Sequence, residues 1–290
     1  MSPIERSVAV PPVEAPPEHS QYSGERRALR RSQAALAAAS ACRLNTSPEL
    51  TIVIPTYNER ENVAPLLQKV RAALPGTRWE VIFVDDNSPD GTADAIRAAG
   101  AEDSRIRLIQ RFGKRGLSSA CIEGMRQSRS RHIGVMDADL QHDERVLPAM
   151  LQEIRSGRLD MVVASRVAHG GSMGKFALHR RLLSKLGTKI SRLVSRSDVT
   201  DAMSGFFVVD RRFFLEVADS LTGTGFKILL DLLASSTRPV RVTEVPYEFG
   251  VRQHGKSKLA VRVELAYLYL LADKIRSQWA RRRSSHRVPI

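Results

Sequence analysis

From residue 50 onward, short apolar runs alternate with stretches in which apolar residues recur at helical spacing. The runs are rich in Val and Ile and have the length of strands. We predict strands at residues 51–54, 80–84, 105–110, 132–136 and 160–164, and helices near residues 61–74, 92–99, 117–128 and 145–156. Strands that alternate with helices predict an α/β fold in which helices flank a mostly parallel central sheet.

The pattern changes after residue 165. Residues 175–196 hold seven Lys or Arg and no acid, and their Leu and Ile residues recur at helical spacing, which predicts a basic amphipathic helix. Further along we predict a strand at residues 205–209, a helix at 226–234, a strand at 240–245 and a long helix at 259–279.

Composition divides the chain into three parts. Residues 1–48 are rich in Pro and poor in apolar side chains, which predicts a disordered tail. Residues 49–258 carry the alternating pattern of one folded domain. Residues 259–290 combine the last predicted helix with an Arg-rich tail, which makes them a candidate for contact with a membrane surface.

The charge balance indicates an anionic partner. Lys and Arg number 45 against 31 Asp and Glu, a net charge of +14, so nucleic acid, an anionic membrane surface and a phosphorylated substrate are the candidates. Aromatic residues, which nucleic-acid-binding proteins use to stack bases, make up only 6% of the chain, which favours the membrane surface over nucleic acid. Two cysteines cannot form a disulfide framework, and we see neither a membrane span nor a secretory signal. We therefore expect a cytoplasmic protein, peripheral at the cytoplasmic face of a membrane.

Polar residues directly follow three of the predicted strands, at residues 55–59, 85–88 and 137–142. Ligands of open α/β sheets bind outside the carboxyl ends of the strands, so these segments are the candidates for a site. Asp137 and Asp139, two residues apart in an extended segment, can reach one hard cation from the same side, and Gln141 continues the alternation. The alternative is that Asp139 or Asp143 only caps the following helix.

The adjacent acids Asp85 and Asp86 need different partners, because neighbouring carboxylates repel each other. One of them could bond to a base or a ribose while the other caps the helix that starts near Gly91. The alternative is that this segment, rich in Asp, Asn, Pro and Gly, is only a turn.

Residues 250–257 read G-V-R-Q-H-G-K-S and match the phosphate-loop pattern of nucleotide triphosphatases. Such a loop normally opens a nucleotide-binding sheet, whereas a single predicted helix follows this one. Arg252 and His254 also occupy positions where close approach of the backbone to phosphate favours small residues. The context therefore disfavours a triphosphatase.

Seven motifs between residues 50 and 259 occur in a recognisable order: TIVIPTYNEREN, VDDNSPDGT, GLSSA, MDADLQH, ASR, MSGFF and FGVRQHGKSKL. Together they resemble family 2 glycosyltransferases, and within that family the dolichol (polyprenol) phosphate mannosyltransferases. The resemblance implies a GT-A fold, GDP-mannose as the donor, a polyprenyl phosphate as the acceptor, and Mg²⁺ or Mn²⁺ as the cofactor. It also implies binding at an anionic membrane surface, alone or through a separate membrane subunit, and no nucleic acid.

The same resemblance assigns residues to the site. The guanosine pocket would be lined by Pro55, Tyr57, Glu59, Val84 and Asp86. The sugar nucleotide would meet Asp137, Ala138 and Asp139, and the metal would lie among Asp137, Asp139 and Gln141. The donor or its diphosphate would contact Arg166, Arg252 and Lys258, and the acceptor phosphate would contact Arg180, Arg192 and Ser204. The candidate catalytic residues are Asp137, Asp139 and Arg252.

The implied reaction is an inverting displacement that gives polyprenyl phosphate β-mannose. The acceptor phosphate is already ionised at neutral pH and needs no strong general base, so Asp201 and Asp231 need not act as bases, although either could orient other groups. The cation and Arg252 would neutralise the charge on the departing diphosphate. A polyprenyl phosphate glucosyltransferase that uses a UDP sugar is the alternative within the class, and a basic nucleic-acid-binding protein is the alternative outside it.

Overall fold

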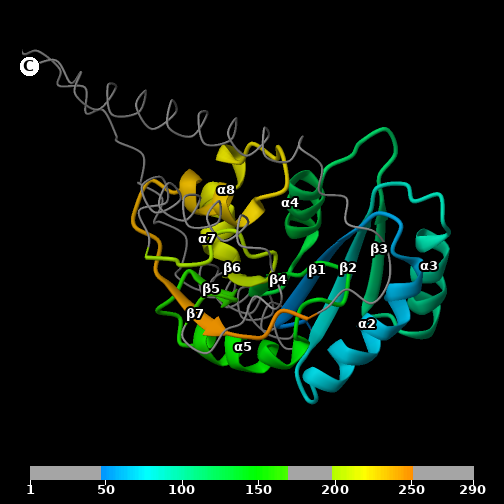
Figure 1. The fold of residues 1–290 in the computed structure, drawn as a ribbon, viewed down its shortest axis with the longest axis horizontal. Coiled ribbons are helices and arrows are strands. Elements are labelled where there is room, and N and C mark those ends of the chain that lie inside the picture. The colour runs from blue at the N-terminus through cyan, green and yellow to red at the C-terminus, as the bar shows by residue number, and fades with distance from the viewer. Residues whose placement is uncertain (1–46, 169–197, 251–290) are drawn as a thin grey trace, which may run out of the picture. The chain divides into compact units, whose positions relative to one another are not determined.

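The structure is a computed structural model, and it describes residues 47–168 and 198–250. Seven strands form one sheet in the order β3-β2-β1-β4-β6-β5-β7 (Figure 1). Their bounds are β1 (Leu50–Thr56), β2 (Trp79–Asp85), β3 (Ile106–Gln110), β4 (His132–Val135), β5 (Met161–Ser165), β6 (Phe207–Asp210) and β7 (Val242–Pro246). The sheet is mostly parallel, because β6 alone among these strands runs antiparallel to its neighbours.

Helices cover both faces of the sheet (Figure 1). The α-helices are α2 (Arg60–Ala73), α3 (Thr92–Glu102), α4 (Leu117–Gln127), α5 (Leu147–Arg155), α7 (Arg211–Val217) and α8 (Ile228–Ser235), and the 3₁₀ turns are η1 (Glu144–Val146) and η2 (Ala218–Ser220). One hydrophobic core forms between the sheet and α2, α3 and α5, and a second forms between the sheet and α4, α7 and α8. The inner strands β1, β2, β4, β5 and β6 are therefore buried from both sides, which explains their continuous apolar runs.

Close packing of α4 on the sheet depends on a glycine. A Cβ atom at Gly124 would lie 2.5 Å from Cγ1 of Val53 and 2.9 Å from Cγ2 of Val84, which is closer than real side chains approach. The neighbouring Cys121 is a buried free thiol that packs in the same core.

The predicted elements within the described residues are confirmed with shifts of a few residues at their ends. Two details differ. The helix predicted from residue 145 begins with the 3₁₀ turn η1, which Asp143 caps, and α7 was not predicted. The predicted helices at residues 175–196 and 259–279 lie outside the described residues, as does the predicted tail up to residue 46. None of the described helices has the length and apolar character needed to cross a bilayer.

The antiparallel strand β6 has a consequence for the site. Because it runs against β4 and β5, the residues that lead into it lie at the carboxyl ends of those two strands. The backbone N–H of Ala164, in β5, donates to the carbonyl of Phe206 over 3.0 Å. Residues 204–206 therefore join the edge of the sheet where β1, β2 and β4 end.

Candidate active site

The carboxyl ends of β1, β2 and β4 lie side by side, so the three polar segments predicted from the sequence meet at one edge. Pro55 pairs with Val84 and Thr56 with Asp85 in the register of β1 and β2, and β4 flanks β1 on the other side. The residues that follow these strands are the predicted nucleotide-binding and Asp-rich segments. The three segments that the sequence singled out therefore lie together at this edge of the sheet.

Asp85 and Asp86 take different partners, but neither caps α3. The buried Asp85 carboxylate accepts hydrogen bonds from the backbone N–H of Ser88 (2.9 Å) and from Thr56 Oγ1 (3.2 Å), and so closes the turn after β2. Asp90 accepts from the backbone N–H of Thr92 (3.0 Å) at the start of α3. The predicted capping role was therefore wrong, because Asp90 is nearer to the start of the helix.

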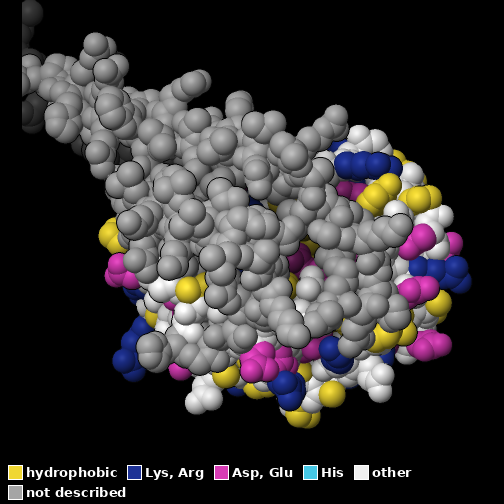
Figure 2. Space-filling view, in the orientation of Figure 1, with side chains coloured by type: hydrophobic (Ala, Val, Ile, Leu, Met, Phe, Trp, Pro, Cys, Tyr) yellow, Lys and Arg dark blue, Asp and Glu magenta, His cyan; other side chains and the backbone are white. Residues whose placement is uncertain are grey.

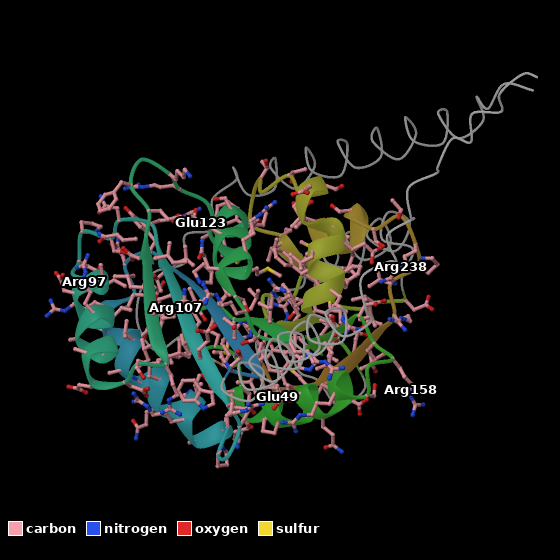
Figure 3. All side chains as sticks on the ribbon, turned by 180° about the vertical axis from the view of Figure 1, so that it is seen from behind. Glu49, Arg97, Arg107, Glu123, Arg158 and Arg238 are labelled. Carbon is pink, nitrogen blue, oxygen red and sulfur yellow. The ribbon has the colours of Figure 1, made fainter. Side chains whose placement is uncertain are left out.

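Asp86 is held by an arginine that the sequence did not single out. Most arginines lie on the outside, such as Arg97 and Arg158 (Figure 3), whereas Arg111 is only 3% exposed. Arg111 Nε donates to Asp86 over 2.6 Å, and the backbone N–H of Gly116 donates to the same carboxylate over 2.8 Å. The Asp86 carboxylate therefore joins the two ends of the loop between β3 and α4.

Tyr57 and Glu59, which were predicted to line the guanosine pocket, lie at the end of β1. The guanidinium carbon of Arg115 lies 4.6 Å from the centre of the Tyr57 ring, so the loop after β3 reaches the predicted pocket. Glu59 accepts from Asn62 Nδ2 over 2.6 Å, and its backbone N–H donates to Thr92 Oγ1 over 2.9 Å. These bonds hold the loop after β1 against the start of α3.

The Asp-rich segment after β4 is not extended throughout. Leu140 has φ +61°, in the left-handed region, and Asp139 Oδ1 accepts from the backbone N–H of Gln141 (3.1 Å). The predicted alternation therefore stops after Asp139. Gln141 is tied to another segment instead, because its backbone carbonyl and side-chain amide bond to the N–H and C=O of Gly250 at 2.7 and 3.1 Å.

The two capping alternatives for this segment have separate outcomes. Asp143 Oδ1 accepts from the backbone N–H of Arg145 over 3.1 Å and caps η1, as one alternative predicted. Asp139 instead bonds to the backbone within its own turn.

Asp137 is fixed by its surroundings. Its carboxylate packs directly against Gly205, where an added Cβ atom would overlap the Asp137 oxygens. His142 Nε2 lies 3.4 Å from Asp137 Oδ2, and His142 Nδ1 lies 2.8 Å from the Tyr247 hydroxyl oxygen. His142 is buried and links Asp137 to the aromatic residues Phe206, Tyr247 and Phe249.

Arg166, at the end of β5, forms a two-point ion pair with Asp201. Nε and Nη2 each donate to one carboxylate oxygen over 2.8 Å. Burial works against the charged form of Asp201, but the Arg166 hydrogen bonds and charge outweigh it, so the pKa of Asp201 lies below its ordinary value. Asp201 thus orients Arg166, as predicted, and Asp231 accepts from the backbone N–H of Thr222 (2.9 Å).

The hydroxyl proton of Ser204 is already used in a hydrogen bond, so it is not available to a ligand at the carboxyl edge of the sheet. Its side chain is buried, donates to the Ala164 carbonyl over 2.7 Å and accepts from the backbone N–H of Phe206 over 3.1 Å. These hydrogen bonds give Ser204 a structural role just before β6. They do not support the predicted contact between Ser204 and the acceptor phosphate. The other predicted residues Arg180, Arg192, Arg252 and Lys258 lie outside the described residues.

Lys227, which the sequence did not single out, interacts with the charged residues around Asp137. It is half-buried, directly precedes α8 and interacts electrostatically with Arg166, Asp137 and Asp201. Burial lowers the pKa of Lys227, and the positive charge of Arg166 acts in the same direction. Asp201 already neutralises the charge of Arg166. The Lys227 ammonium therefore adds a net positive charge, which would attract a phosphate. Nothing in its local sequence distinguishes it from a surface lysine.

Asp137 and Asp139 fit the predicted cation. Carboxylate oxygens are the ligands that Mg²⁺ and Mn²⁺ prefer. Over residues 47–168 and 198–250, no group of three or more His, Cys, Asp or Glu is arranged to hold a metal. Mg²⁺ in nucleotide enzymes is commonly bound through one or two carboxylates together with substrate phosphates. The pair therefore suits a cation that arrives with a diphosphate.

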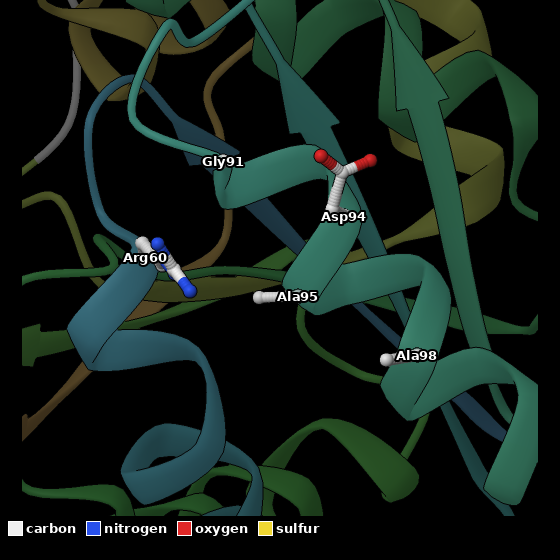
Figure 4. Close-up of a pocket in the computed structure, with 5 residues that line it drawn as sticks. All are labelled: Arg60, Gly91, Asp94, Ala95 and Ala98. Carbon is white, nitrogen blue, oxygen red and sulfur yellow. The ribbon is translucent and has the colours of Figure 1, made fainter.

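A pocket of about 320 Å³ lies apart from the candidate site residues described above, between the starts of α2 and α3 (Figure 4). Its lining residues are Arg60, Gly91, Asp94, Ala95 and Ala98. These side chains do not include the residues predicted for donor, metal or acceptor, so we place the site at the strand ends rather than in this pocket.

A solved structure shares the fold. The mannosyltransferase PcManGT from Pyrobaculum calidifontis, solved in complex with GDP-Man and Mn²⁺, has a TM-score of 0.52 and 16% identity, over 84% of this chain and 77% of its own. The mostly parallel sheet with helices on both faces is therefore the GT-A fold that this glycosyltransferase also has. Two relatives and a family model make the assignment more specific.

The family model for glycosyl transferase family 2 matches residues 51–217. A dolichol-phosphate mannosyltransferase of Mycosarcoma maydis is 35% identical over 240 residues, which are 80% of this chain and 81% of the relative. An undecaprenyl-phosphate mannosyltransferase of Micrococcus luteus is 33% identical over 214 residues, 72% of this chain and 86% of the relative. The chain therefore belongs to glycosyl transferase family 2, and it is a hexosyltransferase.

Proposed function

We propose that this hexosyltransferase transfers mannose from GDP-mannose to a polyprenyl phosphate, with a divalent cation and with inversion at the anomeric carbon. The relatives in Mycosarcoma maydis and Micrococcus luteus support the sugar and the lipid phosphate. The observation that carries the proposal is the Asp137 and Asp139 pair at the carboxyl end of β4, where Asp137 interacts electrostatically with the cationic groups Arg166 and Lys227. Such a site can hold a diphosphate and its cation.

The residues of the site hold charges in place rather than move protons. When bound, the cation would neutralise the diphosphate as it departs. Asp137 and Asp139 would bind that cation, and Lys227 would face the phosphates. His142 is engaged with Tyr247 and Asp201 with Arg166, so both side chains serve to position other groups.

An ionised acceptor phosphate needs no proton removed before it reacts. Its oxygen forms the bond to the anomeric carbon while the bond from that carbon to the diphosphate oxygen breaks. In-line displacement of this kind converts an α-linked donor into a β-linked product. The chain therefore has to supply orientation and charge neutralisation, which together account for much of the catalysis in phosphate chemistry.

The test measures the transfer of labelled mannose from GDP-mannose to a polyprenyl phosphate that is then extracted into organic solvent. Labelled UDP-glucose is assayed in parallel as the alternative donor. We expect label from GDP-mannose that disappears with EDTA and returns with added Mg²⁺ or Mn²⁺. Label from UDP-glucose alone would favour the glucosyltransferase. No transfer from either donor by the folded protein would contradict the proposal.

We further propose that the protein works at the cytoplasmic face of a membrane, as a peripheral protein or with a separate membrane subunit. The net charge of +14 supports attraction to an anionic surface. Family membership makes the alternative of a nucleic-acid-binding protein unnecessary.

Gly205→Ala should reduce this transfer about tenfold to a hundredfold, because a displacement of about 1 Å at a reacting group can cost that much. The added Cβ atom would push the Asp137 carboxylate away, and that carboxylate is the movable end of a side chain. The fold should therefore keep its thermal unfolding temperature. Labelled transfer and a thermal melt measure the two effects.

The matched control is Gly134→Ala, in the neighbouring strand β4. A Cβ atom there would meet its nearest neighbours, Leu50 and Phe207 among them, at 3.8 Å, which is ordinary contact. It should leave transfer within about twofold of wild type, since no site residue moves. Full activity of Gly205→Ala would contradict the assigned role of Asp137.

A further inference from the structure

The described residues expose four large hydrophobic side chains. They are Phe112 (70% exposed), Val167 (48%), Phe226 (42%) and Leu215 (50%). Single exposed hydrophobic residues are normal on soluble proteins. Here, however, three of the four lie next to the active site, and only Leu215 lies elsewhere, in the helix α7.

The three positions share the carboxyl edge of the sheet. Phe112 lies just beyond β3 and Val167 just beyond β5, and both strands end at this edge. Phe226 lies in the turn before α8. The backbone N–H of Ser118 donates to the carbonyl of Gly225 over 3.2 Å, which joins that turn to the start of α4, directly after the Phe112 loop.

The loop that carries Phe112 is fixed at its base. Buried Arg111 donates to the Asp86 carboxylate (2.6 Å) and to the Gly116 carbonyl (3.0 Å), and the Gly116 N–H donates back to Asp86. The loop is thus closed by bonds between its two ends. The fold therefore holds the Phe112 side chain in an exposed position, whereas a phenylalanine on a loose segment could turn inward.

The same loop is basic. Lys114 and Arg115 are exposed, and no Asp or Glu occurs from residue 104 to residue 122. In Figure 2, dark blue and yellow side chains lie next to each other at the place that the loop between β3 and α4 occupies in Figure 1. Aromatic side chains beside Lys and Arg are the composition that binds the headgroup region of anionic bilayers.

We propose that Phe112, Val167, Phe226, Lys114 and Arg115, here called the edge patch, dock the enzyme on an anionic membrane. The inference rests on the proposed function, because a polyprenyl tail stays in the bilayer while its phosphate has to reach Asp137 and Lys227. Phe112 and Phe226 enter the headgroup region, and the two basic side chains pair with lipid phosphates. Docking at this edge brings the acceptor to the side of the sheet where the site opens.

The test is co-sedimentation of the full chain with vesicles of phosphatidylcholine, with and without phosphatidylglycerol. Wild type should bind the phosphatidylglycerol vesicles, and Phe112→Ser with Phe226→Ser should reduce the partition coefficient about tenfold or more. Lys114→Gln should reduce it about fivefold. The control Leu215→Ser removes a similarly exposed side chain on α7 and should bind like wild type.

A second measurement separates docking from chemistry. The Phe112→Ser, Phe226→Ser variant should transfer mannose to a short, water-soluble isoprenyl phosphate at the wild-type rate, and should lose transfer to a long-chain acceptor in vesicles. Vesicle binding that the variant retains, or that wild type never shows, would overturn the edge patch. Normal, patch-dependent vesicle binding without transfer to either acceptor would overturn the proposed function and leave the patch supported.

Discussion

Asp139→Asn should lower the rate of mannosyl transfer by a factor of about 100 or more at saturating GDP-mannose, the size of effect seen when a group that stabilises transition-state charge is removed. The amide keeps the volume of the carboxylate, and its oxygen can still accept from the backbone N–H of Gln141. The turn after β4 should therefore survive. What is lost is a negative charge for the cation that accompanies the diphosphate. The labelled-transfer assay measures the change, and a thermal melt verifies the fold.

Asp143→Asn is the matched control, four residues further along the same segment. Asp143 caps η1 through the backbone N–H of Arg145, and an asparagine can cap a helix nearly as well. This variant should transfer mannose within about twofold of wild type. If Asp139→Asn keeps more than about a tenth of the activity, or if both variants are equally inactive, the role given to Asp139 is wrong.

Asp201→Asn should lower the free energy of unfolding by about 3–5 kcal/mol, because it removes one partner of a buried ion pair and leaves the other charge uncompensated. Asp201 is buried and holds Arg166 through two hydrogen bonds of 2.8 Å. Its own backbone N–H donates to Glu244 over 3.0 Å, so the loop before β6 has little freedom to relax. Urea unfolding monitored by circular dichroism measures the loss.

The pH dependence of this effect has a definite sign. The pKa of Asp201 is lower in the folded state than its ordinary value of about 3.9. The pair therefore stabilises the fold above that ordinary pKa, and its contribution is lost as the pH falls through the folded value. The stability difference between wild type and Asp201→Asn should be constant from about pH 8 to 5 and should shrink below about pH 4.

The control for the ion pair is Asp94→Asn. Asp94 and Arg97 form a pair on α3 whose side chains are 82% and 52% exposed. Such a surface pair contributes between about 0 and 1 kcal/mol. A cost for Asp201→Asn no larger than that for Asp94→Asn would show that Arg166 does not depend on its partner.

The sequence predicted the frame of the fold well because the frame depends on short-range patterns. Each strand buried on both faces contains a continuous apolar run, such as residues 81–84, and each covering helix shows its own apolar period. The short helix α7 was missed because it has only seven residues, too few for a period to show.

The candidate site was predicted in part. Parallel strands end at one edge, so the polar segments after β1, β2 and β4 had to meet, whatever the details of their side chains. The course of residues 139–141 could not be predicted, because Leu140 adopts a left-handed conformation that its residue type rarely takes. The hydrogen bonds of the Ser204 side chain could not be predicted either, because they depend on where β6 lies in the sheet.

By itself, the sequence determined the α/β class, the order of strands and helices along the chain, the polar segments at the strand ends and the family, because these depend on local periodicity and on motifs of adjacent residues. Only the tertiary structure decided which charged groups meet. Arg111 reaches Asp86 across 25 residues, Asp201 reaches Arg166 across 35, and Lys227 comes to the site from the start of α8. Such contacts are selected by burial, since a charge taken out of water needs a partner, and burial exists only once the whole sheet is packed.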